Sequence, residues 1–150
     1  MEIERKYLIE NIEQIPFSLT DFKCKKIEQA YLTTEPVIRV RKDNDEYYLT
    51  YKSKGLLARE EYNLPLTSQS YATLLSKAEG NIITKNRYLI PIDNGLTIEL
   101  DVFEGKFEGL ILAEVEFESV EDAERFTPPH WFGKDVTLSG EYQNSRLSRI

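Results

Sequence analysis

Charged side chains recur at every second position along this chain, beginning with Glu2, Glu4 and Lys6 at its N-terminus. Alternate residues of a β-strand project from the same face. The first segment is therefore expected to be a strand that presents two carboxylates and an amine together. The same rhythm returns in later segments at Arg39 and Arg41, Lys52 and Lys54, Arg59 and Glu61, Lys85 and Arg87, Glu99 and Asp101, and Glu114 and Glu116.

The positions between these charges are largely apolar. They include Ile38, Val40, Leu49, Tyr51, Ile98, Leu100, Val102, Val115 and Phe117. A sheet with one solvated face gives the same alternation. Here, however, the signs are segregated, because the first and the last two expected strands are acidic, whereas the third, fourth and sixth are basic. This segregation favours a charged interior that receives a ligand over an ordinary solvent-facing surface.

Eight strands and few helices are expected. The strands are predicted at 2–9, 24–33, 37–42, 47–54, 58–66, 82–92, 96–104 and 110–118. Turn residues at 43–45 and 93–95 separate neighbouring strands, and helices are predicted at 67–78, 120–126 and 140–149. This pattern predicts a mainly β (α+β) fold, an eight-stranded closed antiparallel β-barrel with a few peripheral helices, in one domain spanning 1–150.

The length, net charge and residue composition of the chain exclude several classes of function. The 150 residues carry a net charge of −7, which opposes sequence-independent binding to nucleic acid. No segment has the apolar length of a bilayer span, and the charged N-terminus lacks an apolar signal core, so a cytoplasmic location without a membrane partner is expected. A single cysteine, Cys24, and a single histidine, His130, argue against a zinc centre or a Ser-His triad.

The remaining charges favour a site for phosphate and metal. Carboxylates lining one lumen repel one another, as do cations, unless a ligand offsets them. Clustered Asp and Glu oxygens favour Mg²⁺ or Mn²⁺, and Arg and Lys side chains suit phosphoryl oxygens. The residue types therefore indicate a metal-assisted site for a chain of phosphates.

The order of these motifs resembles the CYTH superfamily, also called triphosphate tunnel metalloenzymes, over essentially the whole chain. Glu2-x-Glu4-x-Lys6 is similar to the ExExK signature of that family. Matches follow in the family's order at Gln29-x-Tyr31-Leu32, Arg39-x-Arg41, Lys52, Arg59-x-Glu61, Lys85-x-Arg87, Glu99-x-Asp101 and Glu114-x-Glu116. The tail from Gly133 to Thr137, with Tyr142 and Asn144, is similar to the ending of compact bacterial members.

The resemblance implies an eight-stranded tunnel that holds a triphosphate beside a divalent metal, and it implies roles for individual residues. Catalytic roles fall to Glu2, Glu4, Lys6 and Glu116. The implied metal ligands are Glu2, Glu4, Asp101, Glu114 and Glu116. The implied phosphate-binding residues are Lys6, Arg39, Arg41, Lys52, Lys85 and Arg87. Secondary roles fall to Tyr31, Lys54, Arg59, Glu61, Glu99 and Lys134.

The function expected from this resemblance is hydrolysis of inorganic triphosphate to pyrophosphate and phosphate, with Mg²⁺ or Mn²⁺ as cofactor. The compact members that the chain resembles lack extra elements to grip an organic group. Three alternatives remain open: a nucleoside or thiamine triphosphatase, a class IV-type adenylyl cyclase, and a non-catalytic polyphosphate-binding module. The expected partner is a small-molecule triphosphate, and a homodimer is left open.

Overall fold

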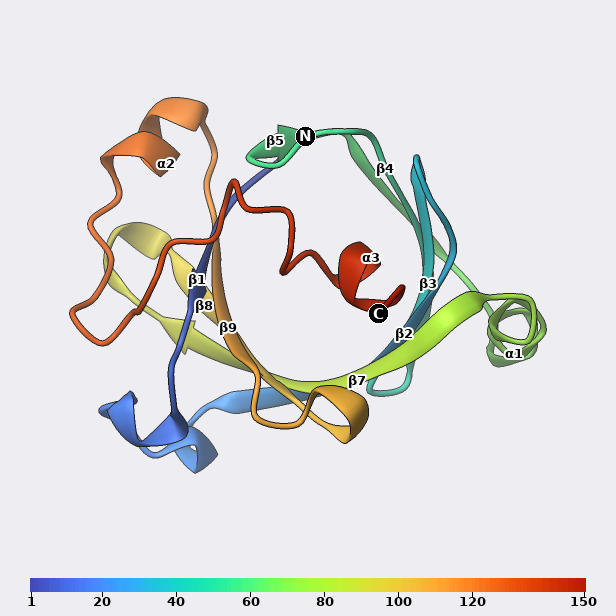
Figure 1. Cartoon of the computed structure of the whole chain (residues 1–150), viewed down its shortest axis with the longest axis horizontal. Helices are drawn as coiled ribbons and strands as arrows, with labels where there is room; N and C mark the ends of the chain where they lie inside the picture. The colour runs from blue at the N-terminus through green and yellow to red at the C-terminus, as the bar shows by residue number, and fades with distance from the viewer.

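In the computed structural model, which describes residues 1–150, an antiparallel sheet curls into a barrel (Figure 1). Its strands are β1 (Glu2–Leu8), β2 (Lys23–Thr34), β3 (Val37–Asp43), β4 (Glu46–Lys52), β5 (Ala58–Arg59), β6 (Glu61–Pro65), β7 (Glu79–Pro91), β8 (Thr97–Phe103) and β9 (Ile111–Glu116). Their order in the sheet is β5-β1-β9-β8-β7-β2-β3-β4-β6. The expected mainly β, barrel-like architecture is therefore confirmed.

The sheet contains nine strands rather than eight, because the strand expected at 58–66 is interrupted at Glu60. β5 pairs with β1, and β6 pairs with β4. The two ends of the sheet are consecutive in the chain, so residues 58–65 close the barrel as the fifth expected strand would. At the break, the backbone of Glu60 forms two hydrogen bonds with Ser53. The Glu60 carbonyl accepts from the Ser53 backbone N–H, and the Glu60 N–H donates to Ser53 Oγ.

Two turns form where the sequence predicts them. Asn44 lies between β3 and β4 with φ of +52°, and Asn94 and Gly95 lie between β7 and β8 with φ of +62° and +70°. Positive φ is the left-handed region, which Gly and Asn enter at least cost. These residues allow the chain to reverse in short turns and keep neighbouring strands in register.

The helices are short. They are α1 (Ser68–Leu75), α2 (Val120–Arg125) and α3 (Asn144–Leu147), with 3₁₀ turns at η1 (Ile12–Gln14), η2 (Leu19–Asp21), η3 (Asp93–Gly95) and η4 (Gly105–Phe107). Thr67 and Ser119 cap α1 and α2 with their side chains. α1 and α3 are shorter than the helices expected at 67–78 and 140–149. After Leu75 the chain forms tighter turns, in which the Lys77 and Ala78 N–H groups donate to the carbonyls of Leu74 and Leu75. None of these helices has the length and apolarity needed to cross a membrane.

The larger apolar cluster covers the outside of β1, β8 and β9. Its members include Ile98, Leu100, Val115 and Phe117, which alternate with the charged positions and pack against α2 and Trp131. Trp131 is buried within this cluster. On this side of the barrel the apolar face points outward under a helix, as the alternation predicts.

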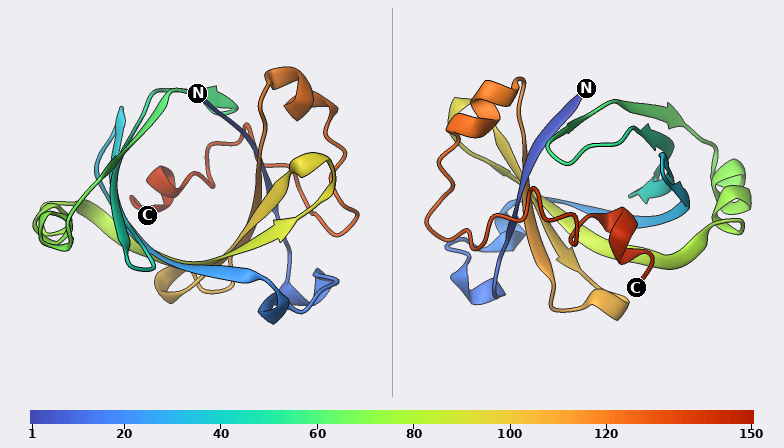
Figure 2. Two further views of the ribbon diagram at one scale, coloured as in Figure 1. Left: turned by 180° about the vertical axis from the view of Figure 1, so that it is seen from behind. Right: turned by 45° about the horizontal axis from the view of Figure 1, so that its top comes forward.

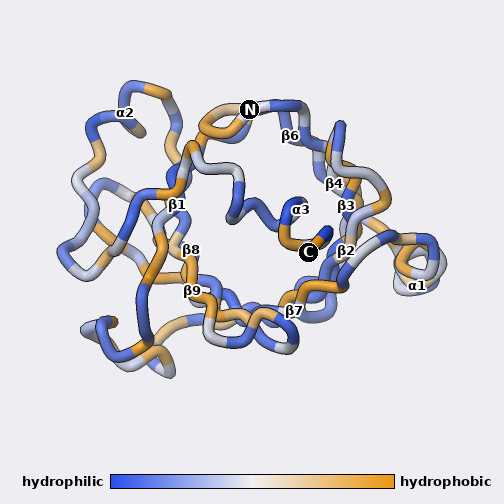
Figure 3. The backbone as a smooth tube through the Cα atoms, viewed as in Figure 1, coloured by the Kyte–Doolittle hydropathy of each residue, from blue (hydrophilic) through white to orange (hydrophobic).

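A smaller apolar cluster lies at one end of the interior. Leu147 of α3 packs there against Tyr31, Val37, Ile83, Phe103, Leu112 and Val136. Ile83, Phe103 and Leu112 continue the inward series of Lys85, Asp101 and Glu114 by one further step along their strands. The lumen is therefore charged along part of its length and apolar around Leu147. Figure 2 shows α3 inside the ring of strands, and the tube of Figure 3 shows both hydrophilic and hydrophobic residues in this C-terminal segment.

Candidate active site

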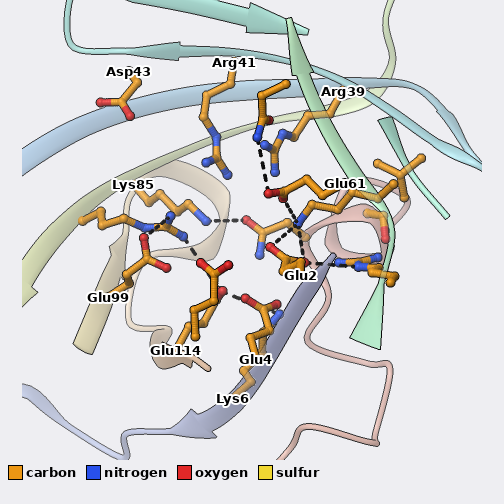
Figure 4. A pocket seen from close by; sticks show the side chains of 18 of the residues that line it. Glu2, Glu4, Lys6, Arg39, Arg41, Asp43, Glu61, Lys85, Glu99 and Glu114 are labelled. Atoms are coloured by element: carbon orange, nitrogen blue, oxygen red, sulfur yellow. Dashed lines mark hydrogen bonds and ion pairs between the residues drawn. The ribbon is translucent and has the colours of Figure 1, made fainter. Parts of the chain in front are cut away.

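The barrel encloses a charged cavity of about 200 Å³ to which every strand contributes at least one side chain. Among its lining residues only Tyr31 and Val37 are apolar. The predicted site residues that line it are Glu2, Glu4, Lys6, Tyr31, Arg39, Arg41, Lys52, Arg59, Glu61, Lys85, Arg87, Glu99, Glu114 and Glu116. In Figure 4, Arg39 and Arg41 point from one side of the cavity toward Glu2, Glu4 and Glu114 on the other. Residues scattered over the whole sequence thus meet in one space.

The carboxylates form one wall because the acidic strands β1, β9 and β8 are neighbours in the sheet. The register places Glu4 opposite Glu116 and Lys6 opposite Glu114. Glu2, Glu4 and Glu114 are buried, whereas Glu116 is exposed. The segregation of charge along the sequence therefore becomes a segregation of charge across the cavity.

The pKa values of Glu4 and Glu114 are displaced in opposite directions. Burial raises the pKa of Glu4 well above its ordinary value, and the charges of Glu114 and Glu2 raise it further. Burial also opposes ionisation of Glu114, but the charges of Lys6 and Arg87 outweigh it, so the pKa of Glu114 lies well below its ordinary value. The two carboxyl groups are hydrogen-bonded. Within this pair, Glu4 therefore holds a proton more readily than Glu114 does.

Cations hold the other buried carboxylate. Glu2 Oε1 lies 3.1 Å from Lys52 Nζ and 3.4 Å from Arg59 Nε, and Lys52 Nζ also lies 3.3 Å from Glu61 Oε2. With the carboxylates drawn toward cations in this way, no three Asp, Glu, His or Cys side chains converge into a chelating group. Of the carboxylates in this wall, Glu2 and Glu114 are thus paired with Lys and Arg side chains.

The opposite wall carries arginines whose hydrogen-bonding capacity is only partly used. Arg39 Nη2 donates to Thr50 Oγ1 at 3.0 Å, but Arg39 Nε is buried without a partner. Arg41 Nε donates to Gln29 Oε1 at 2.8 Å. Burial, followed by the charges of Arg39 and Arg87, lowers the pKa of Arg41. An anion between these guanidinium groups would relieve their repulsion and accept from the guanidinium donors that face the cavity.

Asp101 lies beneath the cavity and does not line it. Its carboxylate accepts from Arg87 Nε at 2.7 Å and from Arg87 Nη2 at 2.9 Å, and Lys85 Nζ lies 2.7 Å from Oδ2. Burial lowers the pKa of Lys85 to about 7, although the charge of Asp101 opposes this shift. Both oxygens of Asp101 are thus paired with phosphate-binding candidates.

Two predicted secondary residues, Lys54 and Lys134, lie outside the cavity and are exposed. β4 ends at Lys52, so the alternation that would turn Lys54 inward stops before it. Lys134 belongs to the segment that follows α2, and its carbonyl accepts from the Leu8 backbone N–H at 2.8 Å. Lys134 therefore contacts β1 through its backbone carbonyl, while its side chain is exposed.

The cavity also includes polar residues that the sequence did not single out. Lys25 and Asp43 line it and form a 3.5 Å ion pair, and Asn63, Asn144 and Ser145 line it as well. One further step of the alternation, from Arg41 to Asp43 or from Glu61 to Asn63, would have identified two of them. The sequence indicates Asn144 only through the resemblance to the C-terminal pattern of the family, without a role. In the structure α3 places it in the lumen.

The sequence of this chain is similar to those of known proteins over essentially its whole length. The model of the CYTH domain family matches residues 1–150. Among characterised relatives, an inorganic triphosphatase of Nitrosomonas europaea is 37% identical over 98% of this chain and 96% of its own length. An inorganic triphosphatase of Acetivibrio thermocellus is 33% identical over 97% of this chain and 92% of its own length.

Solved structures show the same fold. The crystal structure of an inorganic triphosphatase superposes with a TM-score of 0.72 at 35% identity, covering 100% of this chain and 95% of that one. A putative adenylyl cyclase from Hippeastrum, described as having a dominant triphosphatase activity, superposes with a TM-score of 0.65 at 19% identity and covers 83% of each chain. The second likeness concerns the fold alone.

Proposed function

Because this chain belongs to the CYTH family, we propose that it is an inorganic triphosphatase, which hydrolyses triphosphate to pyrophosphate and phosphate. The observation that carries the proposal is the cavity itself, where a wall of buried cations faces a wall of buried carboxylates. A linear polyanion with a bound divalent cation complements both walls. The full-length similarity to two inorganic triphosphatases supports the same substrate.

The size and lining of the cavity favour inorganic triphosphate over an organic one. Sites for drug-sized ligands typically occupy about 300–1,000 Å³ and are mostly apolar. This cavity has about 200 Å³ and only two apolar lining residues, Tyr31 and Val37. It therefore offers no broad apolar surface for an adenine or a thiamine ring, which argues against the nucleoside and thiamine triphosphatase alternatives.

In the proposed complex the cations bind the phosphate oxygens. Arg39 and Arg41 supply guanidinium groups from β3, and Lys85 and Arg87 supply charges from β7. Lys6 on β1 and Lys52 on β4 complete the set. Phosphoryl transfer requires that negative charge on the transferred and leaving groups be balanced while the chain is held in line with the attacking oxygen. These side chains provide that balance and alignment.

The acidic wall fits a hard divalent cation such as Mg²⁺ or Mn²⁺. Glu2, Glu4, Glu114 and Glu116 supply only carboxylate oxygens, the donors that such ions prefer. The charges of Glu114 and Glu2, which raise the pKa of Glu4, amount to an excess of negative charge that a cation would offset. When bound, the metal would neutralise phosphate charge and lower the pKa of a coordinated water. We assign the buried Asp101 to orienting Lys85 and Arg87.

Water is the proposed nucleophile, and no side chain is required to attack phosphorus. Glu116 is suited to accept a proton from that water, since burial, followed by the charges of Glu2 and Glu99, raises its pKa toward the range of an effective general base. Its exposure allows water to reach it from solvent. We therefore assign the role of general base to Glu116, which lines the acidic wall and is open to solvent.

Turnover of a substrate panel tests this proposal. The purified protein is incubated with Mg²⁺ or Mn²⁺ and with inorganic triphosphate, ATP, thiamine triphosphate or longer polyphosphate, and products are identified along with rates. Inorganic triphosphate should give the highest kcat/KM, with pyrophosphate and phosphate as products. Cyclic AMP from ATP would establish the cyclase alternative, and tight binding without turnover would establish the polyphosphate-binding module. The cytoplasmic location and the homodimer remain predictions.

A further inference from the structure

The C-terminal helix α3 lies within the lumen and is anchored at its far end (Figures 1 and 2). Asn81 of β7 donates from its side chain to the carbonyls of Leu147 and Ile150, at 3.3 and 2.7 Å. The Asn81 backbone N–H also donates to the Ser148 carbonyl at 2.7 Å. Leu147 is buried in the smaller apolar cluster. These contacts hold the first residue of α3, Asn144, against the charged cavity.

Asn144 accepts two hydrogen bonds through one atom. Its Oδ1 lies 2.7 Å from Lys85 Nζ and 2.9 Å from Gln29 Nε2. Both partners are donors, so the Asn144 side chain must present its oxygen, rather than its NH₂ group, to them. The ammonium of Lys85 therefore fixes the orientation of the Asn144 amide.

Gln29 extends this arrangement to a second cation. Its side chain is fully buried, and its Oε1 accepts from Arg41 Nε at 2.8 Å. Its Nε2 donates to Asn144 Oδ1 and also to Tyr31 Oη at 3.2 Å. Two neutral amides thus connect Arg41 on β3 with Lys85 on β7. They fix both cations without adding a negative charge that would compete with phosphate.

The remaining polar atom of Asn144 is free to meet a ligand. Both acceptor positions of Oδ1 are used, while Nδ2 has no protein partner and is not sealed from solvent. Asn144 is buried on its other sides and lines the cavity. Its two N–H donors are consequently directed into the space that the phosphate chain would fill.

We propose that Asn144, together with Gln29, positions Lys85 and Arg41 for the triphosphate, and that Asn144 Nδ2 donates to a phosphate oxygen. This inference rests on the proposed function. It makes the C-terminal helix a part of the substrate site, so that the site is complete only when α3 is seated in the lumen. A carboxamide is required at this position, because a carboxylate would satisfy Lys85 and Gln29 but repel the phosphate.

Three variants separate this role from simple anchoring of α3. Asn144→Ala removes the acceptor and the donor. Asn144→Asp keeps the acceptor for Lys85 and Gln29, so it preserves the fold, but it replaces the donor with a negative charge. Asn81→Ala removes two hydrogen bonds from the end of α3 without touching the cavity, and it serves as the control for lost anchoring.

Isothermal titration of inorganic triphosphate into metal-free protein in EDTA gives the readout. Asn144→Ala should weaken binding about tenfold, and Asn144→Asp should weaken it more. Asn81→Ala should bind within about twofold of wild type, even where its thermal unfolding temperature is lowered as much as that of Asn144→Ala. With Mg²⁺, the Asn144→Ala variant should raise KM more than it lowers kcat, as expected for loss of uniform binding.

Wild-type affinity in Asn144→Asp would overturn the inference, as would an equal loss of affinity in Asn81→Ala and Asn144→Ala. In either case the proposed function would stand if wild type binds and hydrolyses triphosphate. Failure of wild type itself to bind triphosphate would overturn the proposed function along with the inference, and the two failures are thereby distinguished.

Discussion

Arg87 and Asp101 form a doubly hydrogen-bonded ion pair beneath the cavity, with Nε to Oδ1 at 2.7 Å and Nη2 to Oδ2 at 2.9 Å. Asp101 has no exposed surface, and it also holds the ammonium of Lys85 at 2.7 Å. One carboxylate therefore orients two of the cations that face the proposed phosphate site. The charge of the cavity depends on a buried anion that the ligand does not need to touch.

Asp101→Asn is expected to destabilise the metal-free protein strongly, because it leaves Lys85 and Arg87 buried without their anion. Breaking a buried pair in this way typically costs about 3–5 kcal/mol. Urea unfolding measures the loss, and added inorganic triphosphate should restore part of it by supplying negative charge. Glu121→Gln, which breaks an exposed pair with Arg125, is the control and should change stability by less than about 1 kcal/mol. Equal stabilities for the two variants would contradict this assignment.

Arg39→Ala should weaken triphosphate binding by about 1.5–3 kcal/mol, the usual range for a hydrogen bond to a charged group. Arg39 lines the cavity and donates to only one protein acceptor, Thr50 Oγ1, so its guanidinium keeps donors for the ligand. Calorimetric titration in EDTA measures the change. Arg39→Lys keeps the charge but loses the forked donors and should give an intermediate affinity. If Arg39→Ala binds like wild type, Arg39 does not contact the phosphate chain.

Glu4 should make the metal-free protein less stable as the pH rises. Burial and the charges of Glu114 and Glu2 raise the pKa of Glu4 above its unfolded value, so the folded state binds the proton more tightly. The stabilisation is complete below the unfolded pKa and is lost as the pH rises through the folded pKa. Because Gln stays neutral, Glu4→Gln should gain stability relative to wild type across this window, by up to about 1.4 kcal/mol per pH unit.

Urea unfolding in EDTA between pH 5 and pH 8 measures this difference. Saturating Mg²⁺ should reverse the trend for wild type at the higher pH, since the ion binds the ionised carboxylate, and should have little effect on Glu4→Gln. A constant stability difference between the two proteins over the whole range would show that Glu4 titrates at its ordinary pKa.

Gly80→Ala should loosen the C-terminal segment. Gly80 has φ of +75°, and a Cβ at this position would clash with the Ser148 carbonyl oxygen. Gly95 has φ of +70° with open space around it, so Gly95→Ala isolates the backbone strain, which costs about 1–2 kcal/mol. Thermal and urea unfolding should show a larger loss for Gly80→Ala, and only that variant should weaken triphosphate binding. Equal losses of stability in the two variants would show that the clash with the Ser148 carbonyl does not lower the free energy of unfolding.

The alternation of charge predicts much of the site because period-two patterning assigns a face to each residue of a strand. It places Arg39, Arg41, Lys85 and Arg87 in one lumen without any knowledge of the sheet order. The order of strands follows from chain connections and short turns, of which Asn44 and the Asn94-Gly95 pair are readable from the sequence.

The alternation does not predict how far along the barrel axis each inward-facing side chain lies. Asp101, Lys85 and Arg87 share the inward face, yet Asp101 lies below the cavity, because depth depends on the tilt and stagger of neighbouring strands. For the same reason Ile83 and Phe103 belong to an apolar end of the lumen. Lys54 faces outward because β4 ends before it, and strand ends are set by tertiary contacts rather than by local pattern.

A ³¹P NMR time course with inorganic triphosphate and Mg²⁺ tests the central claim most directly, using wild type and the Glu4→Gln and Glu116→Gln variants. Wild type should convert triphosphate to equal amounts of pyrophosphate and phosphate. Both variants should lose metal-dependent turnover while circular dichroism shows an unchanged fold, because each removes a carboxylate from the acidic wall. Persistence of triphosphate with folded wild-type protein and saturating metal would contradict the account.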